Sequence, residues 1–129
     1  MSVSEHPDSK QVVMLARLAF LDTGAGVARV RFYSSARGLV TDAATGLLVE
    51  LPLLDPVGTV TAGVLTLSPG AAALNEATGT VLWARVVNGN GDTAFDCSVS
   101  DTAGTGDIKI QSTSLYLGGE TRMVSGVLR

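Results

Sequence analysis

Hydrophobic and polar residues alternate in short runs along most of this chain, and glycine, proline or asparagine separates one run from the next. The clearest run spans residues 27–33, where two kinds of side chain alternate: Ala28, Val30 and Phe32 against Arg29, Arg31 and Tyr33. A period of two residues is typical of a strand with one buried face and one wet face. About seven or eight such runs with turn signals between them predict an all-β domain.

The longest β-type run surrounds the only tryptophan and leads into the clearest turn. Residues 79–87 are largely apolar on both predicted faces, which is typical of an inner strand. We therefore expect Trp83 to lie in the core rather than to form a binding platform. The sequence Asn88–Gly91 supplies residues that accept a positive φ, so it predicts a tight reversal into a returning strand at 93–100.

Another strand pair is predicted in the second quarter of the chain. Two β-prone runs, 47–54 and 59–68, flank the sequence Asp55–Gly58, whose proline and glycine favour a turn. Gly63 lies inside the second run and is expected to form a bulge.

Only the N-terminal part of the chain has the period of a helix. We expect this helix over residues 10–22, behind a mobile arm at 1–9, because Asp8 and Gln11 have the spacing of a capping box. Its apolar residues at helical spacing are Val12, Leu15, Ala16, Ala19 and Phe20, and Met14 and Leu18 widen their face. Such a face packs either against the chain's own sheet or against a neighbouring subunit. The pattern leaves both alternatives open.

These elements together predict an all-β fold with one appended helix. No helical crossover separates the predicted strands, so the sheets should be antiparallel. The chain, residues 1–129, is then a single domain, with an antiparallel β-sandwich of the jelly-roll type over 27–129 and one N-terminal α-helix.

Composition narrows the function. The net charge of −3 provides no general positive field for nucleic acid, so no nucleic-acid partner is expected. The longest apolar stretch, 12–21, contains Arg17 and is too short to cross a bilayer, so no membrane partner is expected either. The acidic residues before it argue against a signal peptide, which predicts synthesis in a cytoplasm.

No group of residues predicts catalysis. Cys97 is the only cysteine and His6 the only histidine, so neither a disulfide nor a cysteine–histidine pair near the core is expected. Asn88, Asn90 and Asp92 have the spacing that opens a calcium loop, but Thr93 and Val99 stand where that loop needs glycine and glutamate. We expect no catalytic residues, no cofactor and no metal site.

A small basic ridge is the remaining charged feature. Arg29 and Arg31 lie on the same face of the predicted strand 27–33. They either pair with nearby carboxylates or contact an acidic partner. The candidate interface residues are therefore Val12, Leu15, Ala19, Arg29 and Arg31.

Several segments carry a resemblance to a known class of proteins. They are the helix followed by Leu21–Gly26 and 27–33, the runs 48–53 and 63–67, Ala77–Thr80 leading into Trp83–Arg85, and the late Ser112–Ser114. This order resembles small virion structural proteins of tailed bacteriophages and prophages, which are similar to jelly-roll capsid cement or decoration proteins. The resemblance covers most of the chain from about Leu15 onward.

The resemblance implies a function without an active site. It implies a non-enzymatic protein of the capsid surface, made in the host bacterial cytoplasm, that binds the major capsid protein and stabilises the shell. It also implies a homo-oligomer, either a dimer or a trimer. The alternative is a tail- or neck-associated jelly-roll module that binds glycan, which an exposed Trp83 or Tyr116 in a groove would favour.

Overall fold

The computed structural model describes residues 7–40 and 44–128. The elements in chain order are α1 (Pro7–Leu21), β1 (Arg29–Tyr33), β2 (Leu47–Thr61), β3 (Val64–Pro69), β4 (Ala73–Leu74), β5 (Gly79–Thr80), β6 (Trp83–Val87), β7 (Thr93–Cys97), β8 (Val99–Ser100), β9 (Ile108–Ile110), β10 (Ser114–Leu115), β11 (Glu120–Thr121) and β12 (Met123–Leu128). The predicted all-β class with one N-terminal helix is confirmed.

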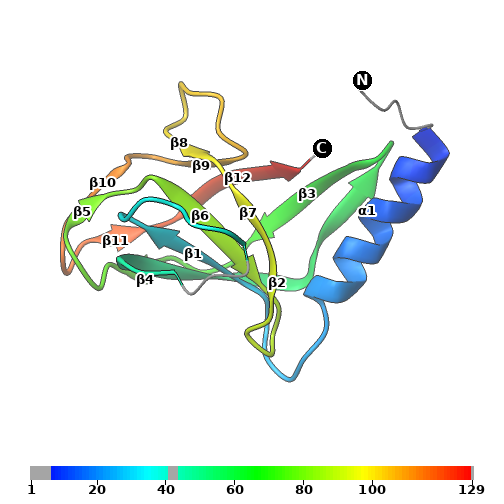
Figure 1. The fold of residues 1–129 in the computed structure, drawn as a ribbon, viewed down its shortest axis with the longest axis horizontal. Coiled ribbons are helices and arrows are strands. Elements are labelled where there is room, and N and C mark those ends of the chain that lie inside the picture. The colour runs from blue at the N-terminus through cyan, green and yellow to red at the C-terminus, as the bar shows by residue number, and fades with distance from the viewer. Residues whose placement is uncertain (1–6, 41–43, 129) are drawn as a thin grey trace.

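Eight strands form one large sheet in the order β7-β6-β1-β2-β3-β12-β9-β8. Two short pairs, β10–β5 and β11–β4, complete the fold. The large sheet curls round on itself, with the short pairs at one end of the long axis and α1 at the other (Figure 1). This strand order keeps β1, β2 and β3 as direct neighbours, and the finer jelly-roll topology is not confirmed.

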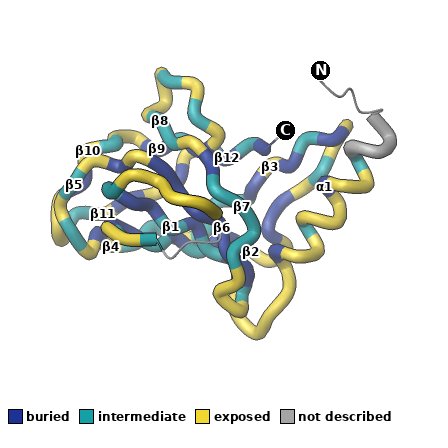
Figure 2. Tube along the Cα trace, in the orientation of Figure 1, coloured by how far each residue is buried: buried dark blue, intermediate teal, exposed yellow. Residues whose placement is uncertain are grey.

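The core lies inside the curled sheet (Figure 2). The alternation in residues 28–32 has the predicted effect, because Ala28, Val30 and Phe32 are fully buried. Tyr33, predicted on the wet face with Arg29 and Arg31, is buried as well, because its ring stacks on Trp83. The expectation for the tryptophan strand is also confirmed: β6 lies between β7 and β1, and every residue in it, including Trp83, is buried. The strand is shorter than predicted, because residues 79–80 leave it to pair with β10.

The pair β2–β3 corrects the predicted turn. β2 continues through Asp55–Gly58, and the register with β3 shifts between Leu53 and Gly58, so that exposed residues 54–56 bulge from the strand. The reversal comes later, at Ala62 and Gly63, which have φ values of 52° and 78°. Two successive positive φ values are typical of the type I′ hairpin turn, which matches the twist of antiparallel strands.

One pair departs from the predicted antiparallel arrangement. β8 and β9 are parallel, although only a short loop joins them. Ser98 and Asp107 exchange two hydrogen bonds at the base of this loop, from Asp107 N to Ser98 Oγ at 2.9 Å and from Ser98 N to Asp107 Oδ2 at 3.3 Å. These bonds bring the end of the loop back beside its start, so that β8 and β9 lie side by side and run in the same direction.

Helix α1 begins earlier than predicted. Pro7 is its first residue, so 7–9, expected to belong to the arm, form its first turn, and residues 1–6 lie outside the described residues. Proline is favoured in this position because the first helical N–H groups have no partner within the helix. The helix packs mainly across β2, with further contacts to β3 and β7.

Candidate interaction surface

Helix α1 is fixed to the sheet near both ends. Near its start, the Gln11 side chain accepts a hydrogen bond from Gly63 N at 2.6 Å and donates one to Val60 O at 3.3 Å, in the β2–β3 turn region. After its end, Asp22 Oδ1 accepts from Val57 N at 2.9 Å. These long-range bonds hold the helix in a defined position, so its other faces are presented rigidly.

Only one side of α1 faces the core. Met14 and Leu21 are buried and Leu18 is partly buried against the same cluster. At about 100° per residue, these three positions fall on one side of the helix. The sequence pattern did not single out this side, because apolar residues occur in succession at 12–15 and fit several helical faces.

The predicted interface residues of α1 point away from the sheet. Val12 is 66% exposed, Leu15 is 46% exposed and Ala19 is also exposed. The structure brings the three together on what we call the outer face of α1 (Val12, Leu15 and Ala19). Packing against the chain's own sheet is therefore wrong for these three residues, but it holds for Met14 and Leu18, which the prediction added to the same face. Burial of the outer face against another subunit stays a prediction.

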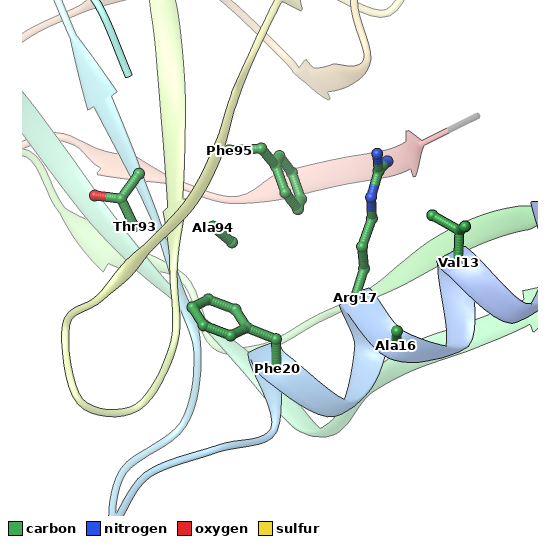
Figure 3. Close-up of a pocket in the computed structure, with 7 residues that line it drawn as sticks. All are labelled: Val13, Ala16, Arg17, Phe20, Thr93, Ala94 and Phe95. Atoms are coloured by element: carbon green, nitrogen blue, oxygen red, sulfur yellow. The ribbon is translucent and has the colours of Figure 1, made fainter. Parts of the chain in front are cut away.

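A groove separates α1 from β7 on a third side of the helix. It has a volume of about 590 Å³, and its lining consists of Val13, Ala16, Arg17, Phe20, Thr93, Ala94 and Phe95. In Figure 3, Phe20 points from the helix toward β7 and Arg17 extends on the side of Phe95. β7 is the first strand in the order of the large sheet, so one side of its backbone has no neighbouring strand in that sheet.

Sequence reasoning missed this groove because its two walls lie far apart in the chain. The available signal was Arg17, the only charge in the apolar stretch 12–21. A charged residue within an apolar helix lies either on a side that faces solvent or at a position where a partner binds. The structure places Arg17 at the rim of the apolar groove.

The basic ridge forms ion pairs within the sheet. Arg31 Nε lies 2.6 Å from Glu50 Oε2, and Arg29 Nη1 lies 3.2 Å from Glu50 Oε1. β1 and β2 place Arg31 directly opposite Glu50, so the sheet register produces the contact. The structure therefore shows the first of the two predicted alternatives, pairing with a nearby carboxylate. Contact of these arginines with a partner stays a prediction.

A further ion pair, between Arg85 and Asp96, is buried, and the register places it in one row with Arg31, because Arg31 lies opposite Arg85 and Arg85 opposite Asp96. Arg85 Nε lies 2.7 Å from Asp96 Oδ1, and the two side chains are 7% and 1% exposed. Arg85 also lies over the Trp83 ring, 5.2 Å from its centroid, and Trp83 stacks on Tyr33. Burial acts to raise the pKa of Asp96, but hydrogen bonds and charge attraction from Arg85 and Arg37 outweigh it and lower that pKa. This cluster is a structural unit of the sheet.

The opposite end of the molecule carries a second exposed apolar group. We call it the tip and define it by Leu74, Tyr116 and Leu117, which are 66%, 68% and 68% exposed. Gly119 N donates to Tyr116 O at 2.8 Å and Gly118 has a φ of 82°, so residues 116–119 form a type II turn with Leu117 at its corner. The visible sequence signal was a leucine placed directly before two turn glycines.

Asn75 holds this tip together from beneath. It is buried, and its Nδ2 donates to Tyr116 O at 3.0 Å while its Oδ1 accepts from the Thr121 hydroxyl. Its backbone N also donates to Gly119 O at 2.7 Å. No local sequence pattern indicates this role, because the partners lie more than 40 residues away.

Cys97 is a buried thiol, and Asn88 shapes a turn. Burial, together with nearby Asp107 and Asp96, raises the pKa of Cys97 to about 12, so its thiol stays protonated at neutral pH. Asn88 Oδ1 accepts from Asn90 N and Asp92 N, both at 3.0 Å, and so shapes the hairpin turn. Among residues 7–40 and 44–128, no three His, Cys, Asp or Glu side chains are grouped as a metal site requires. His6 lies outside the described residues.

No helix within the described part of the chain has the length and apolar character needed to cross a membrane. Comparison of the chain with protein families, with curated proteins and with solved structures found no match.

Proposed function

We propose that this chain is a non-enzymatic structural protein of a bacteriophage virion, which binds the major capsid protein at the capsid surface and stabilises the shell. The observation that carries the proposal is the outer face of α1, where Val12, Leu15 and Ala19 are exposed on a helix fixed near both ends. The resemblance of the chain to jelly-roll cement proteins supports the choice of partner.

An exposed apolar helix face suits docking into a hydrophobic groove. Because α1 is already fixed to the sheet, binding does not have to order it, which removes part of the entropic cost of association. Full burial of one valine or leucine side chain contributes about 1.5–3 kcal/mol, so each copy binds with modest strength. A shell offers many equivalent sites, and linked copies would then bind together far more tightly than one copy alone.

Co-sedimentation with capsid shells from the source phage tests the proposal. We expect Val12→Lys/Leu15→Lys to weaken shell binding by about 100-fold, because two lost apolar contacts amount to roughly 3 kcal/mol and each 1.4 kcal/mol is a factor of ten. Thermal unfolding of this variant should match the wild type, since both side chains are exposed.

Val124→Lys is the matched control. Val124 lies in β12 and is 46% exposed, as Leu15 is, but it belongs to another surface. It should leave shell binding within about a factor of two, as is usual for a substitution outside an interface. Wild-type binding by the double α1 variant would contradict the proposal.

A tail- or neck-associated glycan-binding module is the second candidate, because Tyr116 is exposed beside a small hollow of about 180 Å³ with polar residues in its lining. We rank it second for two reasons: the hollow is below the usual range of about 300–1,000 Å³ for ligand pockets, and Trp83, the other aromatic candidate, is buried. If this alternative holds, Tyr116→Ala will abolish binding to host surface glycans and leave shell binding unchanged.

A further inference from the structure

The groove between α1 and β7 has the composition of one half of a protein interface. Phe20 and Phe95 give it apolar walls, and Arg17 places a positive charge at its rim. Among the residues that the structure describes, no carboxylate forms an ion pair with Arg17, whose one hydrogen bond there is to Met14 Sδ at 3.8 Å. A thioether is a weak acceptor, so this guanidinium remains available to a carboxylate from outside.

The tip has the composition of the other half. Leu74, Tyr116 and Leu117 are its exposed apolar side chains. β4 and β11 place Glu120 directly opposite Leu74, so a carboxylate stands beside the apolar group. Within the described part of the chain Glu120 has no ion pair, and Arg122, just after β11, lines the same small hollow as Glu120.

The two halves cannot meet within one molecule. The tip lies at one end of the long axis and α1 at the other, with the curled sheet between them (Figure 1). Apolar surfaces that match in character and carry opposite charges are typical of complementary sides of one interface. The second copy of the chain is the one partner that is certain to carry the missing half.

We propose that copies of this chain associate head to tail, with the tip of one copy seated in the α1–β7 groove of the next and Glu120 opposite Arg17. This contact is heterologous, because the two surfaces differ, and each added copy leaves one free tip and one free groove. The assembly therefore grows until it closes into a ring or continues as a filament.

This contact is separate from the proposed docking to a shell. Arg17 and Phe20 lie on the groove side of α1, whereas the outer face contains Val12, Leu15 and Ala19. At about 100° per residue, Arg17 is turned roughly 140° from Val12 around the helix. Self-association can thus be tested with the purified protein alone, and its failure would leave the proposed function untouched.

Charge reversal provides the first test. Sedimentation velocity over a range of concentrations should show the wild type as a series of oligomers. Arg17→Glu and Glu120→Arg should each raise the dissociation constant by at least about 100-fold, since each sets like charges against each other at the contact. The double variant Arg17→Glu/Glu120→Arg should assemble like the wild type, because the pair is restored with its charges exchanged.

Mixing the two single variants provides the sharper test. Each variant alone is expected to be a monomer. In the mixture, however, the groove of each variant meets a tip of opposite charge on the other variant. An equimolar mixture should therefore regain assembly, with the two chains alternating. A symmetric dimer through α1 would not show this recovery.

Controls separate this contact from folding and from shell binding. Lys109→Glu reverses a charge on β9, away from both surfaces, and should assemble normally. Val12→Lys/Leu15→Lys should also assemble normally. A wild type that stays monomeric at high concentration, single variants that assemble like the wild type, or a mixture that stays monomeric would each overturn the inference.

Discussion

Replacing Asp96 by alanine is expected to lower the free energy of unfolding by about 3–5 kcal/mol, the cost of removing one partner from a buried ion pair. Asp96 is 1% exposed and meets the Arg85 guanidinium through two contacts, at 2.7 and 3.2 Å. Without the carboxylate, the almost fully buried Arg85 charge loses its bidentate partner while its desolvation remains. Chemical denaturation of the two proteins at pH 7 measures the difference.

The same ion pair predicts how the stability of the folded protein changes with pH. The pKa of Asp96 is lowered in the folded protein, so the carboxylate stabilises the fold at pH values above the pKa of an unfolded aspartate, which is about 3.9. This contribution is lost as the pH falls through the lowered pKa. The stability difference between wild type and Asp96→Ala should therefore be constant from about pH 5 to 7 and shrink below about pH 4.

Glu50→Ala is the control for this prediction. Glu50 also pairs with two arginines, but its side chain is 28% exposed, as is that of Arg31. Exposed pairs contribute about 0–1 kcal/mol, so this variant should lose far less stability than Asp96→Ala. Equal losses from the two variants would contradict the assignment of Asp96 and Arg85 as a buried unit.

Replacing Asn75 by alanine is expected to lower the free energy of unfolding by about 1–3 kcal/mol. The side chain of Asn75 is buried, and its loss leaves the buried Thr121 hydroxyl without its partner. It also removes one of the two donors to Tyr116 O, which keeps the bond from Gly119 N. Each buried polar group left without a partner costs about 1–3 kcal/mol. Because these bonds hold the turn that presents Leu117, the variant should also lose head-to-tail assembly.

Denaturation and sedimentation measured on the same preparation test both effects. Glu76→Ala, at the neighbouring exposed position, should stay within about 0.5 kcal/mol of the wild type. A stable Asn75→Ala variant that assembles normally would show that Asn75 does not organise the tip.

Local patterns in the sequence predicted those elements that depend on near neighbours. The alternation at 27–33 predicted the buried face of β1, and Asn88–Gly91 predicted the turn between β6 and β7. The helix was predicted to within three residues at its start and one at its end. In each case a period or a positive-φ signal lay within one element.

The remaining features depend on contacts that no local pattern records. Asp55–Gly58 has the composition of a turn, yet the pairing with β3 carries the strand past it to Ala62 and Gly63. The orientation of α1 depends on which of several apolar faces fits the surface of β2 and β3. The groove and the tip each join segments far apart in the chain, as Arg17 with Phe95 and Asn75 with Tyr116 show.

Quantitative mass spectrometry of purified phage particles from the source strain tests the central proposal most directly. We expect a copy number comparable to that of the major capsid protein, because a cement protein occupies equivalent sites over the whole shell. A handful of copies per particle would move the protein to the neck or tail. Its absence from particles would contradict the virion assignment altogether.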